Sequence, residues 1–167
     1  MSGFPGRPAV VVADASPLIA LARIERLGLL QQLFGKVLIP KAVERELCLD
    51  SGRPGSRTLS AAKQDGWVQT EDVREAPSAL KSTVDQGEAE AIILAKRHSA
   101  LLLIDETRGR AAARSEGVRV FGSGTVLIRA QQEGLVPKVA PELRKLSAAG
   151  YHLAISLQKE ILRQAGE

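Results

Sequence analysis

The sequence predicts an α/β protein, a three-layer α/β/α sandwich with a central parallel sheet. Two observations support this prediction. Short apolar runs such as 9–13 (AVVVA) and 101–104 (LLLI) contain no polar alternation, which is typical of strands buried on both faces of a parallel sheet. Segments with helical spacing of apolar residues separate these runs, and such alternation favours a parallel sheet with helices on both faces.

The first expected helix follows the first strand, with Ser16 as its N-cap and Pro17 in its first turn. Asp85 and Glu88 fit the two positions of a capping box, so a helix is expected over 85–98. The expected strands are 9–13, 37–39, 67–70 (a short strand or edge segment), 101–104 and 118–121. Further helices are expected near 27–34, 40–49, 58–64, 107–116, 122–133, 138–148 and 153–163.

Length and composition predict a single globular domain over 1–167. Hydrophobic residues make up 44% of the chain, yet no apolar run reaches the roughly 18–20 residues that span a bilayer. The N-terminal apolar stretch is too short for a good signal peptide. A lone cysteine, Cys48, excludes an internal disulfide framework and a cysteine-based zinc site. We therefore expect a soluble cytoplasmic protein with no membrane association.

The charge distribution is more informative than the net charge of +4. Residues 59–106 hold 9 acidic and 5 basic residues, whereas the segments on either side are net basic. A polyanion would be attracted by the basic flanks and processed at a metal held by the acids. A solvated surface of mixed charge would give the same pattern.

Carboxylates occur where the predicted strands end. Asp14 directly follows the first strand and Asp105 follows the strand 101–104, while Glu44 begins the helix after the second strand. Glu88 and Glu90 lie near the start of the helix that precedes 101–104. Ligands of open parallel sheets bind beyond the carboxyl ends of the strands, so these acids are candidates for one site.

Each acid alone also has an ordinary structural explanation. Asp14 and Asp105 could cap the next helix, Glu44 could be a surface acid, and Glu88 belongs to the capping box; capping does not explain Glu90. Together, however, several carboxylates at one sheet edge repel one another, and a divalent cation removes that conflict. Mg²⁺ or Mn²⁺ prefers such oxygen ligands, activates water and neutralises charge on a phosphoryl group.

Other chemistries fit the sequence less well. It contains no phosphate-binding P-loop motif, and residues 122–124 (GSG) lack the third glycine of a dinucleotide fingerprint. Ser16 is not in a nucleophile elbow, and His98 and His152 have no paired spacing. A receiver-like domain would need a lysine after a late strand, and a D-x-D phosphatase would need a second aspartate after Asp14; neither is present.

The sequence resembles the PIN-domain family of metal-dependent ribonucleases, in particular small stand-alone prokaryotic (VapC-like) members. The resemblance covers nearly the whole chain. It rests on VVADASPLIAL at 11–21, VERE at 43–46, DQGEAEAIILA at 85–95, LLIDETRGRAAA at 103–113, VFGSGTVL at 120–127 and the C-terminal stretch from 150.

The resemblance implies four catalytic acids, of which three also bind the metal, with Glu88 joining them as a ligand. The fourth position is open, because many members read T-x-D where this chain reads Asp105-Glu106-Thr107. Asp105 is preferred over Glu106, since it is nearer the strand end. Small hydroxyl residues near the metal match Ser16 and Ser123. The four catalytic acids are Asp14, Glu44, Glu90 and Asp105, and the metal ligands among them are Asp14, Glu90 and Asp105.

The implied activity is endonucleolytic cleavage of single-stranded RNA by water that Mg²⁺ or Mn²⁺ activates. Arg110 and Arg114 share one helix face and are expected to contact RNA phosphate. Many small members are toxins held inactive by a small antitoxin protein, and the family often forms homodimers. The alternative is a non-catalytic PIN-like module that binds RNA or protein, although this chain has an acid at each of the four positions.

Overall fold

The computed structural model describes residues 10–74 and 76–167 and contains the predicted parallel sheet. Five strands lie in the order β3-β2-β1-β4-β5, and every neighbouring pair is parallel. The short segment predicted near 67–70 is the edge strand β3. The strands are β1 (Val11–Ala13), β2 (Val37–Pro40), β3 (Val68–Glu71), β4 (Leu101–Leu103) and β5 (Val120–Phe121).

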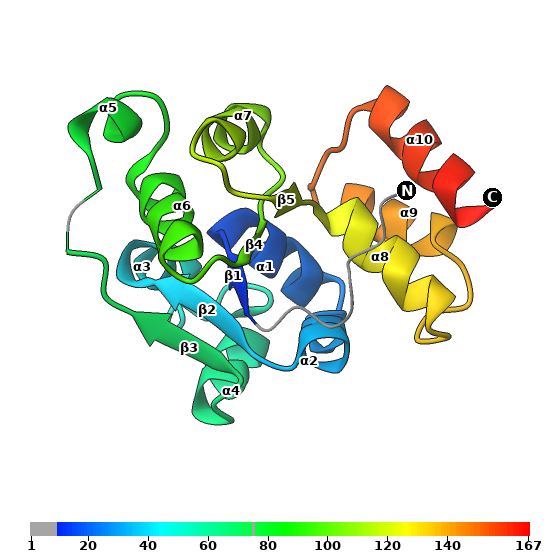
Figure 1. The fold of residues 1–167 in the computed structure, drawn as a ribbon. Coiled ribbons are helices and arrows are strands. Elements are labelled where there is room, and N and C mark those ends of the chain that lie inside the picture. The colour runs from blue at the N-terminus through cyan, green and yellow to red at the C-terminus, as the bar shows by residue number, and fades with distance from the viewer. Residues whose placement is uncertain (1–9, 75) are drawn as a thin grey trace.

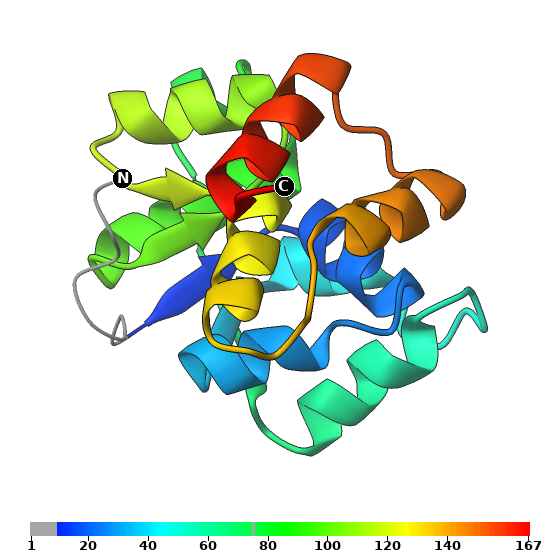
Figure 2. The same cartoon turned by 90° about the vertical axis from the view of Figure 1, so that its right-hand side faces the viewer.

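Helices cover both faces of this sheet, which confirms the predicted three layers (Figure 1). Helix α6 (Gln86–Arg97) packs on β1, β2 and β4 from one side. Helices α1 (Ala15–Arg23), α2 (Gly28–Phe34) and α8 (Ser123–Gln132) lie on the other side, as the turned view in Figure 2 shows. The other helices are α3 (Lys41–Leu47), α4 (Ser56–Gln64), α5 (Ser78–Lys81), α7 (Thr107–Ser115), α9 (Ala140–Ala148) and α10 (Ile155–Ala165).

The two central strands are completely buried, as their uninterrupted apolar sequences require. Val11, Val12, Leu102 and Leu103 have no exposed surface. Burial of each such side chain contributes about 1.5–3 kcal/mol, so apolar burial stabilises the centre of the sheet together with the backbone hydrogen bonds between the strands. The strand ends are therefore a rigid platform for the side chains that follow them.

One local prediction was wrong, one short helix was not predicted, and one local prediction was confirmed. Helix α1 begins at Ala15 with Asp14 as its N-cap, so Ser16 lies in the first turn and is exposed. The four-residue helix α5 was not predicted, because it is too short to show helical periodicity. Asp85 and Glu88 do form the predicted capping box of α6. The first strand was predicted from residue 9, which lies outside the described residues, and β1 begins at Val11.

The C-terminal part of the chain packs on the face that α8 covers. Ile161 of α10 sits directly against Gly124, where a Cβ atom would overlap its side chain. This close packing holds α10 on α8, and the connector before α10 brings Tyr151 to the carboxyl edge of the sheet. Within the described ranges, no helix is long and apolar enough to cross a membrane.

Candidate active site

The two strands at the centre of the candidate site are β1 and β4. The chain passes from β1 outward to β2 and β3 and then returns to β4 on the other side of β1, so the strand order reverses between β1 and β4. Such a reversal opens a crevice at the carboxyl ends of the strands, where α/β proteins bind ligands. Asp14 follows β1 and Asp105 follows β4, and the Asp14 N–H donates to the Leu103 carbonyl at 2.9 Å.

The Asp14 carboxyl group is buried and incompletely satisfied. Its exposed fraction is 5%, and its Oδ1 atom has no hydrogen-bond partner among the described residues. The pKa of Asp14 is raised to about 7. Desolvation is the largest cause, the hydrogen bond from the Ala15 backbone N–H opposes it, and the charges of Glu88, Glu46 and Asp85 add to it. A buried oxygen without a partner is costly, so this atom is placed to accept a ligand or a cation.

Glu88 of α6 combines a structural role with a place in the acid cluster. Its Oε2 accepts the Asp85 N–H at 3.2 Å in the capping box, while Oε1 lies where a Cβ atom on Gly109 would come within 2.8 Å. Desolvation raises the pKa of Glu88 to about 7, and Asp85, Glu106 and Glu46 add to this, against the backbone hydrogen bond from Asp85. A Cβ atom at 109 would also come within 2.6 Å of Ile104 Cδ1, so glycine lets α7 approach this carboxylate without displacing either side chain.

The acid that α3 contributes to the cluster is Glu46, which was not among the predicted site residues. The Glu44 carboxylate instead binds Lys63 Nζ at 2.5 Å, and this hydrogen bond lowers the pKa of Glu44. The Glu46 carboxyl group lies over Gly87, where a Cβ atom would overlap it. Although Glu46 as a residue is exposed, desolvation of its carboxyl group and the charge of Asp85 raise its pKa.

Helical periodicity contained the signal that distinguishes these two glutamates. Ala42 and Val43 are buried, and position 46 follows them by four and three residues, so it lies on the same helix face. This face packs against α6. Glu44 lies on a different face, which turns toward α4.

Glu90 is buried with both carboxylate oxygens in use. Its Oε1 accepts the backbone N–H of Ala42 at 3.3 Å, and its Oε2 accepts the Gln86 side-chain amide at 2.9 Å. The exposed fraction is 6%. Glu90 therefore links α6 to the first turn of α3, and its charge contributes to the raised pKa of Glu46.

Asp105 is held by three hydrogen bonds. Its Oδ1 accepts the Ser123 backbone N–H at 2.8 Å, while Oδ2 accepts the Ser123 hydroxyl at 2.5 Å and the Tyr151 hydroxyl at 2.6 Å. Burial raises the pKa of Tyr151 above its ordinary value, and the charge of Asp105 adds to the shift. The phenol therefore keeps its proton and donates it in the hydrogen bond to Asp105. Ser123 thus lies beside Asp105, as does Tyr151, which was not among the predicted residues.

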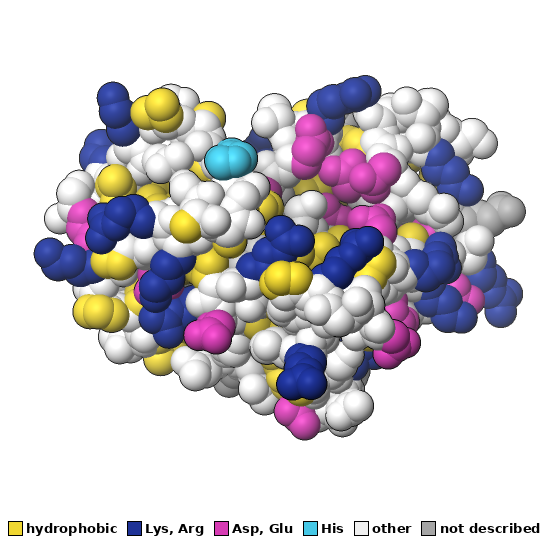
Figure 3. Space-filling model, turned by 180° about the vertical axis from the view of Figure 1, so that it is seen from behind, with side chains coloured by type: hydrophobic (Ala, Val, Ile, Leu, Met, Phe, Trp, Pro, Cys, Tyr) yellow, Lys and Arg dark blue, Asp and Glu magenta, His cyan; other side chains and the backbone are white. Residues whose placement is uncertain are grey.

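Glu106 has a different environment from Asp105. It is exposed and caps α7, accepting the Gly109 N–H at 2.7 Å. The charge of Glu106 nevertheless contributes to the raised pKa of Glu88. A shallow pocket of about 320 Å³ opens between these acids, lined by Ser82, Thr83, Val84, Asp85, Glu88, Glu106 and Arg108. Figure 3, which shows the molecule from behind, has Asp and Glu side chains gathered beside a hollow in its upper part.

The two predicted phosphate-binding arginines differ in their exposure. Arg110 is half-buried and donates to the Ile104 carbonyl at 3.0 Å. Burial and the charge of Arg114 lower the pKa of Arg110, and Asp105 opposes this effect. Arg114 is exposed one helical turn further along α7. Arg110 is thus positioned beside Asp105, and Arg114 faces solvent.

The acid cluster comprises Asp14, Glu46, Asp85 and Glu88, whose charges act on one another. Within the described part of the chain, no three Asp, Glu, His or Cys side chains already stand close enough to hold a metal ion. The chemistry of the donors nevertheless fits Mg²⁺ or Mn²⁺, because they are carboxylate oxygens and one buried oxygen of Asp14 has no partner in the part of the chain that the structure describes. A cation would also relieve the repulsion that raises the pKa of Asp14 and Glu88.

Comparison with known proteins agrees with this fold. A PilT N-terminus domain protein of the hyperthermophilic archaeon Sulfolobus solfataricus P2 is 16% identical, with a TM-score of 0.51 over 72% of this chain and 92% of that chain. A domain of a functionally unknown protein from Methanocaldococcus jannaschii DSM 2661 is 20% identical, with a TM-score of 0.47 over 68% of this chain and 90% of that chain. No curated protein was found to match the sequence. A family model described as PIN domain matches residues 10–167, and the chain therefore belongs to the PIN-domain family.

Proposed function

We propose that this protein is a divalent-metal-dependent endoribonuclease that cleaves single-stranded RNA. The observation that carries the proposal is the buried, unpartnered Asp14 Oδ1 atom at the strand-order reversal, with Glu88 and Glu46 close enough to raise the pKa of Asp14. PIN domains are in general nucleases, and a pocket rich in carboxylates suits a reaction at a phosphate only when a cation is present.

Asp14 and Glu88 are the residues proposed to hold Mg²⁺ or Mn²⁺, with Glu46 completing the ligands from α3. When bound, the ion supplies an activated water and neutralises charge on the phosphate. Asp105 is oriented by Ser123 and Tyr151, so its carboxylate is fixed at the rim of the crevice. Glu90 holds α3 against α6, which positions Glu46 through the backbone of Ala42.

Metal-dependent cleavage of an unstructured RNA tests this proposal. We expect cleavage by the wild-type protein with Mg²⁺ or Mn²⁺, none with a chelator, and at least about a hundredfold loss for Asp14→Asn, a typical cost of removing a key electrostatic group. Glu25→Gln is the matched control, because Glu25 is an exposed acid beyond the far end of α1. RNA binding without cleavage under all conditions would favour the non-catalytic PIN-like module.

The proposed biological context is a cytoplasmic protein that a small antitoxin protein inhibits and that forms a homodimer. Helix α10 begins with two aliphatic side chains in solvent, Ile155 at 72% and Leu157 at 45% exposure, which suits contact with a second copy. Sedimentation of the wild-type protein and of Ile155→Glu/Leu157→Glu tests the homodimer. Co-expression with the protein encoded by the neighbouring reading frame tests the antitoxin.

A further inference from the structure

A second pocket lies at the same edge of the sheet, beside the acid cluster. Its volume is about 180 Å³, and basic side chains from three segments line it. We call it the basic pocket. Its four cations are Lys41 and Arg45 of α3, Arg74 after β3, and Lys81 of α5, and its remaining lining residues are Asp72, Val73, Ala76, Gln86 and Glu90.

Three of these cations have no ion pair or side-chain hydrogen bond within the described chain, although the charge of Arg45 acts on its neighbour Glu46. Arg45, Arg74 and Lys81 form no ion pair and no side-chain hydrogen bond with another described residue. Lys41 lies 3.9 Å from Asp72, and both side chains are more than half exposed, so this pair is weak. The positive charge of the pocket is thus available to a ligand.

The two acids in the lining leave the pocket net positive. Glu90 directs its oxygens to the N–H of Ala42 and to Gln86, which reduces its repulsion toward an anion. Asp72 is exposed and loosely held by Lys41. Among the described lining residues, four cations stand against two carboxylates, which favours an anionic ligand over a cation.

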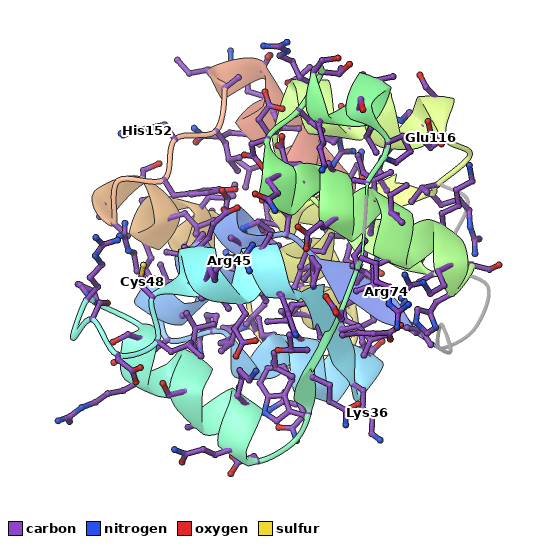
Figure 4. All side chains as sticks on the ribbon, turned by 90° about the vertical axis from the view of Figure 1, so that its left-hand side faces the viewer. Lys36, Arg45, Cys48, Arg74, Glu116 and His152 are labelled. Carbon is purple, nitrogen blue, oxygen red and sulfur yellow. The ribbon has the colours of Figure 1, made fainter. Side chains whose placement is uncertain are left out.

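Size and geometry narrow the ligand to a phosphate group. Sites for drug-sized molecules measure about 300–1,000 Å³, so the basic pocket is too small to enclose a nucleoside. Arginine presents a planar fork that binds two phosphate oxygens at once. Figure 4 shows Arg45 on α3 and Arg74 on the segment after β3, both on the side of the molecule that faces the viewer.

The basic pocket and the acid cluster share helix α3. Arg45 lines the pocket and its neighbour Glu46 belongs to the acid cluster, while Glu90 lines the pocket and acts on the pKa of Glu46. A single-stranded RNA that lies across α3 would therefore reach both the basic pocket and the acid cluster within a short length of its backbone. We propose that the basic pocket binds a phosphodiester group of the same single-stranded RNA, adjacent to the one held for cleavage at Asp14. This inference rests on the proposed function.

Binding of a short, fluorescently labelled, unstructured RNA tests the proposal by anisotropy over a range of salt concentrations. The Asp14→Asn protein is the background, so that the RNA stays intact. Arg45→Ala/Arg74→Ala should weaken binding at low salt at least about tenfold, as expected when charge-assisted hydrogen bonds are removed. The slope of log K against log salt should fall by about 0.7 for each phosphate that the variant no longer neutralises.

The matched control is Lys36→Ala/Arg119→Ala, which removes the same charge. Lys36 and Arg119 are exposed and directly precede β2 and β5, at the opposite edge of the sheet. Arg45→Lys/Arg74→Lys should recover part of the affinity. If the pocket variant binds with the same affinity and salt slope as the control, the basic pocket does not contact RNA.

Two further comparisons separate the pocket from the nuclease proposal and from other phosphates. Wild-type protein that fails to cleave, together with weaker binding by Arg45→Ala/Arg74→Ala, would refute the nuclease and leave the pocket supported. Cleavage by the wild-type protein, together with unchanged RNA binding by Arg45→Ala/Arg74→Ala, would support the nuclease and refute the pocket. A terminal 5′-phosphate that strengthens binding only when Arg45 and Arg74 are present would overturn the assignment to an internal phosphodiester.

Discussion

Removing the charge of Asp14 should stabilise the metal-free protein. The Asp14 carboxyl group is almost fully buried, and its pKa rises from an ordinary 3.8 to about 7. In the folded protein the group therefore binds its proton more tightly than in the unfolded chain. Folding is then favoured while the group is protonated, and this contribution is lost as the pH rises from about 4 through 7.

The size of the effect follows from the two pKa values. A difference of about 3 pH units at 1.36 kcal/mol per unit corresponds to about 4 kcal/mol, which is the upper bound for a structure that does not relax. An asparagine in place of Asp14 would stay neutral at every pH and could still accept the Ala15 N–H. We therefore expect Asp14→Asn to exceed the wild-type stability by about 2–4 kcal/mol at pH 8.

Urea unfolding with a chelator, between pH 4 and pH 8.5, measures this difference. The variant should lack a large part of the stability loss that the wild-type protein shows over that range. Glu88, whose pKa is also about 7, and Glu46, whose pKa is also raised, account for further loss. Glu44→Gln is the control, because the hydrogen bond from Lys63 lowers the pKa of Glu44 and the change should cost up to about 1 kcal/mol. An Asp14→Asn protein less stable than wild type at pH 8 would show that the Asp14 carboxylate is a structural group.

Three other predictions concern metal binding, activity and Asp105. Binding of Mn²⁺ should release protons at pH 6 and tighten as the pH rises toward 8, because the pKa values of Asp14 and Glu88 are both about 7. Calorimetry in buffers of different ionisation heat measures the proton release, and binding at pH 6 without proton release would contradict the prediction. Glu46→Gln should reduce RNA cleavage at least about tenfold and Glu44→Gln should leave it within about twofold, and the reverse order in a cleavage assay would return Glu44 to the site. Tyr151→Phe should lower the free energy of unfolding by about 1 kcal/mol through loss of its hydrogen bond to Asp105, and an unchanged urea midpoint would show that this bond is not formed in solution.

The fold was predictable because its signals are local. The apolar runs at β1 and β4 and the capping box of α6 each lie within a few consecutive residues, and each was found in the predicted place. Helix α5 was missed because four residues make little more than one turn. The start of α1 was placed two residues late, since Ser16 and Asp14 are both good N-cap residues and tertiary packing selects between them.

The site was only partly predictable, because side-chain direction depends on which elements pack together. Asp14 and Asp105 follow adjacent strands, so their positions at one edge came from the sheet alone. The choice between Glu44 and Glu46 required knowing that the inner face of α3 packs on α6. Tyr151 reaches Asp105 across 46 positions of sequence, and no short pattern in the chain indicates that contact.

The double use of Glu88 has a consequence for how easily this fold can lose its chemistry. A capping box functions with glutamine as well as with glutamate, so Glu88→Gln keeps the start of α6 and also relieves the crowding of negative charge. Asp14→Asn likewise keeps the shape of the aspartate. Single isosteric changes at these positions thus move the chain toward greater stability and away from metal binding. Inactive descendants that keep the surface for binding RNA or protein are therefore expected to fold more stably than the active protein. Retention of both acids then requires selection for an activity.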